Sequence, residues 1–358
     1  MKRATQAAVL ITASALILAA CADAPDEPGN GDDTAPPAEA VDFRGCIVSD
    51  AGGFDDKSFN QAGYEGLIQA RDDLGIEVSQ AESQAETDFA PNIDSMVNQD
   101  CDVIITVGFL LADATAEAAE ANPDAHFAII DDQSIEADNV KPLVFNTAEA
   151  AFLAGYLAAG YTTTGTVATY GGIPIPPVTI FMDGFVDGVA HYNEVKGTDV
   201  QVLGWDKESQ QGEFVGNFDD IAAGQNLSRS LIDAGADVIL PVAGPVGGGT
   251  AAAAQEAGDV AVIWVDSDGV ETAPEYADVI MTSILKQMGP AVFDVVSGMI
   301  DGSFDNTPYV GTLENEGVGL APFHNFDGEI SDELKAEIDQ IRADIIAGEI
   351  VVESPATP

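Results

Sequence analysis

Asp50-Ala51-Gly52-Gly53-Phe54-Asp55-Asp56-Lys57-Ser58-Phe59-Asn60-Gln61 joins a short apolar strand, residues 46–49, to the start of a helix. Ser58 and Gln61 have the spacing of a capping box, which predicts Phe59 and Asn60 in the first helical turn. A strand followed by a helix predicts an open α/β sheet, in which ligands bind beyond the carboxyl ends of the strands. A glycine-rich turn with an aromatic ring, an amide and carboxylates suits a neutral, flat, hydroxylated ligand. It does not suit a phosphate, because the carboxylates would repel an anion and no phosphate-binding loop is present.

The N-terminus predicts export. Lys2 and Arg3 precede the apolar residues 7–20, which is the pattern of a signal peptide over residues 1–20. Leu18-Ala19-Ala20-Cys21 resembles a bacterial lipobox, so we expect Cys21 to carry lipid; the alternative is an ordinary signal peptide with an incidental cysteine. Residues 21–42 are acidic and proline-rich and predict an extended tether. We therefore expect a protein anchored by lipid on the extracytoplasmic face of the cell membrane.

Charge limits the partners. The chain has 12 Lys+Arg against 61 Asp+Glu, a net charge of −49, and removal of Lys2 and Arg3 with the signal peptide changes this to −51. Nucleic acid is excluded as a partner, because binding it needs clustered basic charge. The acidity either helps to exclude anionic ligands or reflects a saline habitat or a compositional bias of the source proteome.

Cysteine and histidine are sparse. Cys46 and Cys101 each precede an apolar run that predicts a buried strand, and an extracytoplasmic site permits a disulfide. A bridge between them and two buried free thiols both remain open at this point. The three histidines are isolated from cysteine and from one another, so we expect no metal site and no cofactor.

The body of the chain alternates strand and helix patterns, which predicts parallel sheets covered by helices on both faces. Residues 43–358 are long enough for two lobes. The expected strands are 46–49, 76–80, 103–107, 126–130, 166–169, 199–203, 237–241, 260–265, 279–283, 308–312 and 317–322. The expected helices are 59–73, 88–99, 111–121, 147–161, 177–194, 220–234, 247–257, 286–301 and 331–346.

A series of motifs in sequence order resembles the basic membrane protein family, the purine nucleoside receptor lipoproteins of ABC transporters. The resemblance covers roughly residues 44–325. The motifs that carry it, besides residues 50–61, include Ile104-Ile105-Thr106-Val107-Gly108-Phe109, His126-Phe127-Ala128-Ile129-Ile130-Asp131, Ala151-Phe152-Leu153-Ala154-Gly155-Tyr156, Gly216-Asn217-Phe218-Asp219-Asp220, Val265-Asp266-Ser267-Asp268 and Thr282-Ser283 with Lys286.

The resemblance implies a type I periplasmic-binding-protein fold, an α/β fold with two doubly wound parallel-sheet lobes joined by a multi-stranded hinge. We expect residues 43–145 and 267–304 in the first lobe, and residues 146–266 and 305–358 in the second. It also implies a monomer that delivers a nucleoside to the permease of an ABC importer. The ligand-binding residues carried over by matching position are Asp50, Phe59, Asn60, Asp131, Phe218, Gly244, Asp266 and Lys286.

The resemblance assigns roles to these residues. Phe59 and Phe218 sandwich the base, because flat heterocycles stack on aromatic faces, and Asn60 reads the base edge. Gly244 lets the backbone approach the sugar, while Lys286 donates to ribose and the three Asp accept from base or ribose. The alternatives are a core position for Phe218 and a surface position for Lys286.

Other residues receive structural interpretations. Asp55 and Asp56 are interpreted as helix-capping charges, and Phe181 and Phe185 as core. The chain departs from the family at Trp264, where glycine is usual, and at Gly269, where glutamine is common; these departures leave the ligand preference open.

Two other classes of protein compete with this interpretation. A nucleoside hydrolase would need a calcium-binding aspartate motif, but Ser49 and Ala51 stand where its first two carboxylates would be. A surface lipoprotein without a transport role would explain the tether but not the paired aromatic residues and the aspartates.

Overall fold

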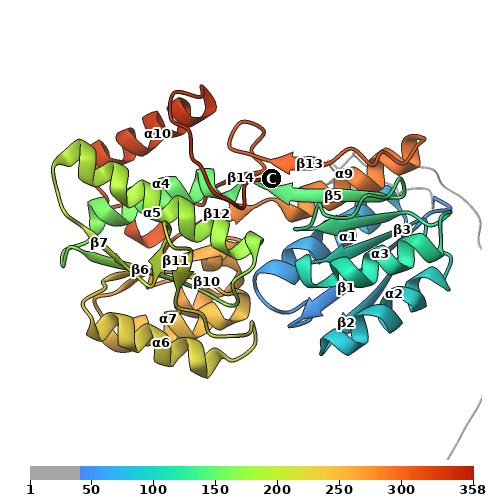
Figure 1. Cartoon of the computed structure of the whole chain (residues 1–358), viewed down its shortest axis with the longest axis horizontal. Helices are drawn as coiled ribbons and strands as arrows, with labels where there is room; N and C mark the ends of the chain where they lie inside the picture. Colours follow the sequence, from blue (N-terminus) through green and yellow to red (C-terminus); the bar gives the residue numbers. More distant parts are fainter. Residues whose placement is uncertain (1–40) are drawn as a thin grey trace, which may run out of the picture. The chain divides into compact units, whose positions relative to one another are not determined.

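In the computed structural model, which describes residues 41–358, two six-stranded sheets organise the chain (Figure 1). The first sheet has the order β2-β1-β3-β4-β5-β13, and all of its strands are parallel. Its strands are β1 (Arg44–Ala51), β2 (Glu77–Ser83), β3 (Val103–Val107), β4 (Phe127–Ile130), β5 (Val140–Phe145) and β13 (Tyr309–Gly311). Helices α1 (Phe59–Leu74) and α9 (Met288–Asp301) pack together on one face of this sheet, and α2 (Phe89–Val97) and α3 (Ala112–Ala121) on the other.

The second sheet has the order β7-β6-β10-β11-β12-β14, with β14 alone antiparallel to its neighbour. Its strands are β6 (Thr166–Gly171), β7 (Gln201–Leu203), β10 (Val238–Val242), β11 (Ala261–Asp266), β12 (Ile280–Lys286) and β14 (Val318–Leu320). Helices α4 (Thr147–Tyr161) and α5 (Pro176–Lys196) cover one face, and α6 (Ile221–Asp233) and α7 (Gly247–Ala257) the other. Helix α10 (Asp332–Ile346) packs on α4.

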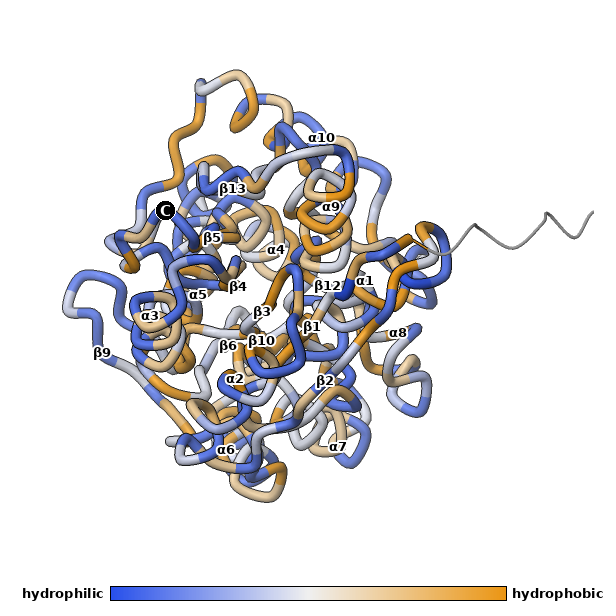
Figure 2. Tube along the Cα trace, turned by 90° about the vertical axis from the view of Figure 1, so that its right-hand side faces the viewer, coloured by the Kyte–Doolittle hydropathy of each residue, from blue (hydrophilic) through white to orange (hydrophobic). Residues whose placement is uncertain are grey.

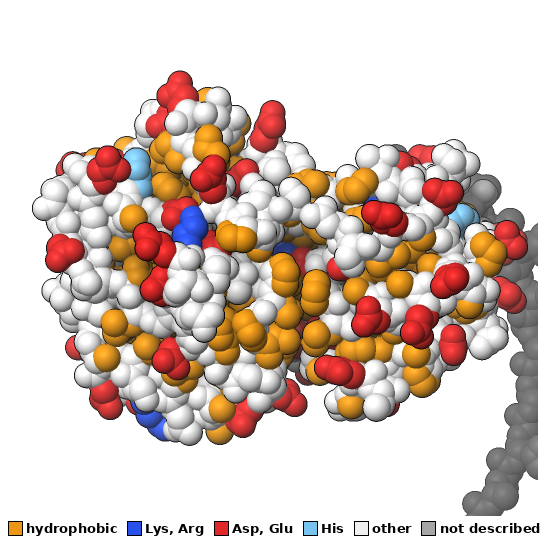
Figure 3. Space-filling model, in the orientation of Figure 1, with side chains coloured by type: hydrophobic (Ala, Val, Ile, Leu, Met, Phe, Trp, Pro, Cys, Tyr) orange, Lys and Arg blue, Asp and Glu red, His pale blue; other side chains and the backbone are white. Residues whose placement is uncertain are grey.

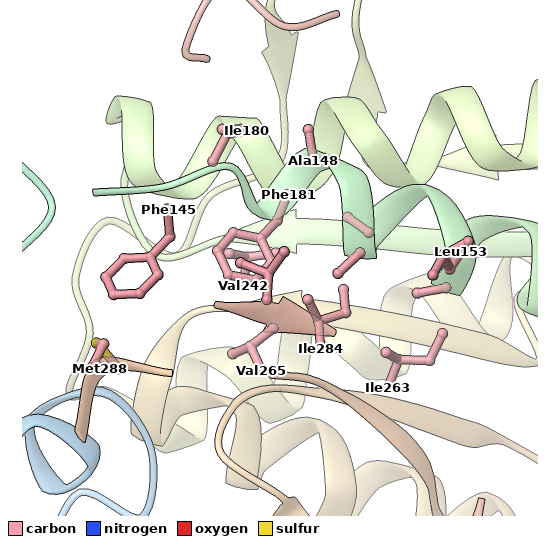
Figure 4. Packing of buried hydrophobic residues seen from close by; sticks show 14 of the residues in the cluster. Phe145, Ala148, Leu153, Ile180, Phe181, Val242, Ile263, Val265, Ile284 and Met288 are labelled. Atoms are coloured by element: carbon pink, nitrogen blue, oxygen red, sulfur yellow. The ribbon is translucent and has the colours of Figure 1, made fainter. Parts of the chain in front are cut away.

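Helix α4 is buried on nearly all sides, because α5, α10, β12 and β14 surround it. Its alanine- and glycine-rich sequence presents small side chains, which lets these neighbours approach closely. In Figure 4, Ala148 and Leu153 of α4 lie above Ile263 and Ile284 of the second sheet. In Figure 2, hydrophobic residues follow the central strands, whereas hydrophilic stretches lie mainly on the outside.

The predicted fold class is confirmed, and most predicted elements lie within two residues of the observed bounds. The sequence pattern missed β5, because Pro142 lies in its middle and proline argues against a strand inside a sheet. The hairpin of β8 (Trp205–Asp206) and β9 (Gln211–Gly212) was also missed, since two-residue strands have no readable period.

The chain passes between the sheets three times, after β5, after β12 and after β13. The expected boundaries put residues 267–304 in the first lobe, but β12 pairs with β11 in the second sheet. They also put residues 305–358 in the second lobe, but β13 pairs with β5 in the first. The chain leaves the second lobe after β12 rather than after β11, because β12 pairs with β11 and extends the second sheet. The next helix, α9, then packs on α1 of the first lobe. The remaining boundaries stay a prediction.

A disulfide joins Cys46 on β1 to Cys101 just before β3, with their Cα atoms 6.0 Å apart. The two strands are parallel neighbours, and Cys46 pairs in register with Ile104, so Cys101 lies three residues below it. The structure thus contains the bridge rather than two free thiols. The bond closes a loop of 55 residues around β2 and α2.

Acidic side chains are scattered over both lobes, with few basic side chains between them (Figure 3). Within residues 41–358, no helix is both long and apolar enough to cross a membrane. The signal peptide (residues 1–20), Cys21 and the tether up to residue 40 lie outside the described residues.

Candidate functional site

A cavity lies where the carboxyl ends of β1, β10, β11 and β12 and the loop after β4 meet. All eight residues predicted to bind ligand line it: Asp50, Phe59, Asn60, Asp131, Phe218, Gly244, Asp266 and Lys286. The structure brings the predicted residues together, although their individual contacts with a ligand remain a prediction.

The start of α1 differs from the predicted capping box. Asp56, not Ser58, caps the helix: its Oδ1 accepts from the backbone N–H of Ser58 and Gln61, both at 3.0 Å, and its Oδ2 accepts from that of Asn60 at 2.8 Å. The capping box is therefore wrong, and the capping role of Asp56 is confirmed. Asp55, the other residue interpreted as a capping charge, is exposed, and the capping hydrogen bonds go to Asp56 instead.

Asn60 holds Asp50. The Nδ2 of Asn60 donates to Asp50 Oδ1 at 2.7 Å and to Asp56 Oδ2 at 3.1 Å, while its Oδ1 accepts from the backbone N–H of Asp50 at 3.1 Å. Both amide hydrogens are in use, so Asn60 retains only acceptor capacity on Oδ1 for a ligand. The geometry makes Asn60 a support for the Asp50 carboxyl rather than a free amide.

Burial shapes the acidity of the site. It raises the pKa of Asp50 from 3.8 to about 8, and the hydrogen bond from Asn60 opposes this rise only in part. Burial also raises the pKa of Asp266 to about 6, opposed by the charge of Lys286 and the hydrogen bond from Ser58. At neutral pH Asp50 is therefore mostly protonated and Asp266 mostly ionised, so the first offers a donor and the second an acceptor.

Asp131 and Asp266 occupy equivalent places in the two lobes, just after β4 and at the end of β11. Both have left-handed backbones, with φ of 69° and 70°. Non-glycine residues rarely adopt this conformation, and such strain gathers at functional sites. The strained turns direct both carboxyl groups into one cavity.

Lys286, at the end of β12, forms a buried ion pair with Asp131 of the other lobe. Its Nζ lies 4.9 Å from the ring centroid of Phe59 and 5.8 Å from that of Phe181. The alternative surface position for Lys286 is thus excluded, since the side chain is 3% exposed. Among the described residues that line the cavity, Lys286 is the only basic one, against four aspartates.

Phe59 comes from α1 of the first lobe and Phe218 from the segment before α6 of the second, and both rings are half-buried. Gly172 makes room for Phe218, because a Cβ there would lie 2.2 Å from the ring. Gly108, with a φ of 115°, makes room for Asp50 and Phe59 in the same way. The structure does not bear out a core position for Phe218.

Some lining residues were not predicted, including Phe181, which had been interpreted as core; Phe185 is indeed core. In Figure 4 the Phe181 ring lies beside Val242, with Val265 below, and these apolar residues line the cavity. A helical spacing shows that a face is buried but not whether a cavity borders it, so no sequence signal separated Phe181 from Phe185. In the described part of the chain, no cluster of three His, Cys, Asp or Glu side chains could hold a metal ion.

Trp264 and Gly269, the departures from the family pattern, lie in contact with each other. The Trp264 side chain is buried in the outer core of the second lobe, where a Cβ on Gly269 would approach it to 2.6 Å. Neither residue lines the cavity. The two residues therefore pack against each other outside the cavity wall.

Comparison with known proteins agrees with this geometry. The chain matches the family described as ABC transporter substrate-binding protein, PnrA-like, over residues 44–355. It is 30% identical to the "ABC transporter nucleoside-binding protein BmpA" of Lactococcus lactis, over 99% of each chain. It is 31% identical to "Basic membrane protein A" of Borreliella burgdorferi, over 85% of this chain and 86% of that one.

Among solved structures, an ABC transporter solute-binding protein from Aeropyrum pernix superposes with a TM-score of 0.79 at 25% identity, over 87% of this chain and 94% of that chain. The family consists of binding proteins for ABC transporters rather than enzymes. With its two-lobed fold and its interlobe cavity, the chain belongs to the PnrA-like family of ABC transporter substrate-binding proteins.

Proposed function

We propose that this protein captures purine nucleosides outside the cell and delivers them to the permease of an ABC importer, as a monomer held to the membrane by lipid on Cys21. The observation that carries the proposal is the pair of half-buried rings, Phe59 and Phe218, that reach one cavity from opposite lobes. A purine between them would stack on both, and such contacts contribute about 1–3 kcal/mol per base. The name of the Lactococcus relative adds support for a nucleoside ligand.

The polar groups favour a neutral ligand over a nucleotide. Four aspartates and one lysine line the cavity, and that lysine is already paired with Asp131. A phosphate dianion would lose its hydration among these carboxyl groups without an adequate partner, which is costly in a closed site. A nucleoside instead offers hydroxyl and amino hydrogens that ionised carboxylates accept.

Asp50 and Asp266 would play different parts. With its pKa raised to about 8, Asp50 carries a proton at pH 7 and donates it in a hydrogen bond to a ring nitrogen. Asp266 is mostly ionised at pH 7 and accepts from a ribose hydroxyl. Asn60 then acts through Asp50, which it holds in place.

Two experiments test the proposal. Mass spectrometry of small molecules released from purified, denatured protein should detect a purine nucleoside, because a closed cleft retains its ligand. Calorimetry should then show binding of inosine, adenosine or guanosine, and no detectable binding of the matching 5′-monophosphates. Binding of nucleotides as tightly as nucleosides, or a failure of all three purine nucleosides to bind, would refute it.

A further inference from the structure

The side-chain hydroxyl of Ser58 forms a hydrogen bond between the two lobes. Ser58 stands at the start of α1 in the first lobe, but its Oγ donates to Asp266 Oδ2 of the second lobe at 2.8 Å and lies 3.3 Å from the carbonyl oxygen of Val265. The side chain is fully buried. This bond therefore forms only when the lobes are together and solvent has left the contact.

The local backbone is arranged to free this hydroxyl. A serine before a helix ordinarily uses its side chain to cap the helix, yet here Asp56 caps α1 and Ser58 makes no side-chain capping bond. Lys57 before it adopts a left-handed φ of 61°. Such outliers persist only where the surroundings enforce them, and they mark functional segments.

The acceptor of the bond is a residue of the ligand site. Asp266 lines the cavity, and its own backbone is left-handed. With Oδ2 accepting from Ser58, this end of the carboxylate is fixed, and its other oxygen, Oδ1, keeps its acceptor capacity for a ligand. Ser58 itself does not line the cavity.

We propose that Ser58 is a positioning residue that couples lobe closure to ligand recognition, by donating to Asp266 across the closed cleft and orienting that carboxylate for a ligand hydroxyl. This inference rests on the proposed nucleoside function. It gives the motif before α1 a role besides that of supplying Phe59. Closure and recognition are then one event, since Asp266 is held in place only in the closed protein.

The bond also supports the ionised form of Asp266. The Ser58 hydroxyl and the charge of Lys286 lower the pKa of Asp266 against the rise caused by burial and by nearby carboxyl groups. Removal of the hydroxyl therefore raises that pKa further, and the loss of ligand binding on acidification begins at a higher pH. The charged or titratable groups that face Asp266 are Lys286 from β12, Asp131 after β4, Asp50 on β1 and Asp56 before α1.

The test is a double-mutant cycle with Ser58→Ala, Asp266→Ala and the double variant, measured by titration calorimetry with inosine and adenosine from pH 5.5 to 8. Ser58→Ala should weaken binding about 10- to 100-fold, the range of a hydrogen bond to a charged group. It should have no further effect when Asp266 is already alanine. Ser267→Ala is the matched control, because its hydroxyl also crosses to the first lobe, 3.4 Å from the carbonyl oxygen of Ser58, but does not touch Asp266.

The pH profile separates positioning from general packing. Ser58→Ala should move the acidic loss of binding to higher pH, whereas Ser267→Ala should not. Additive effects in the cycle, or an unshifted pH profile, would overturn the inference while leaving nucleoside binding established.

If the wild-type protein binds no purine nucleoside, the proposed function fails first. The same four proteins in urea unfolding without ligand then decide whether Ser58 and Asp266 are coupled. Additive losses of stability there would overturn the inference, and coupling would retain it for whatever ligand the cavity takes.

Discussion

Protonation of Asp50 makes the stability of the ligand-free protein fall as pH rises. Burial raises the Asp50 pKa from 3.8 to about 8, so between these values the folded protein keeps a proton that the unfolded chain has released. The state that binds more protons loses stability as pH increases. Each pH unit within this window costs about 1.4 kcal/mol, which is about 3 kcal/mol between pH 5 and pH 7.

Asp50→Asn removes this titration and preserves the shape of the site. An asparagine Oδ1 still accepts from Asn60, and the backbone N–H of residue 50 still donates to Asn60. Relative to wild type, the variant should therefore gain about 3 kcal/mol in the free energy of unfolding between pH 5 and pH 7. The gain should be absent at about pH 3 and below, where Asp50 is protonated in both the folded and the unfolded protein.

Urea unfolding of ligand-free protein followed by circular dichroism provides the measurement. The matched control is Asp259→Asn. Asp259 is exposed in the turn before β11, so this substitution also removes one carboxylate, but at a position away from the cavity. A stability difference between wild type and Asp50→Asn that does not change with pH would refute the raised pKa, and with it the donor role proposed for Asp50.

Four further outcomes are expected. Phe218→Ala should weaken purine nucleoside binding by about 1–3 kcal/mol in calorimetry. Phe304→Ala, which removes a half-buried ring packed against His126 in the first lobe, should not change it; equal effects would contradict stacking. Reduction of the Cys46–Cys101 bond, which closes a loop of 55 residues, should lower the free energy of unfolding by about 4 kcal/mol, and a Cys101→Ser variant should be insensitive to reductant. The melting temperature should rise between low salt and 1 M NaCl, because a net charge of −49 repels itself and salt screens it; a flat profile would contradict this. Cys21→Ser should move the expressed protein from the washed membrane fraction to the soluble one, since the proposed anchor is lipid.

The parts of the site that could be predicted from sequence lie at the carboxyl ends of strands. Asp131 directly follows a buried apolar run, Asp266 ends another, and Phe59 starts the helix after a third. The alternation of strands and helices along the sequence places such residues at one edge of a sheet. The family resemblance then assigned residues of both lobes to the same ligand site. This is why all eight predicted residues share one cavity.

The parts that could not be predicted depend on contacts between distant segments. The hydroxyl of Ser58 fits a capping box until Asp266, 208 residues later, is placed beside it. The Asn60 amide looks free until Asp50 and Asp56 fold against it. Strand β5 carries a proline that locally argues against a strand, and its pairing with β4 and β13 is decided by the sheet as a whole.

The buried aspartates also bear on why the cleft should respond to ligand. In the closed, ligand-free protein, Asp50, Asp131 and Asp266 all have pKa values raised by burial, so removal of water from these groups opposes closure. A nucleoside that donates to Asp266 and accepts from Asp50 replaces the lost water and removes part of that opposition. An apolar molecule of the same shape would fill the space between the phenylalanines but leave the carboxyl groups unpaired. We infer that stacking supplies much of the affinity, whereas the aspartates make closure selective for a hydroxylated ligand.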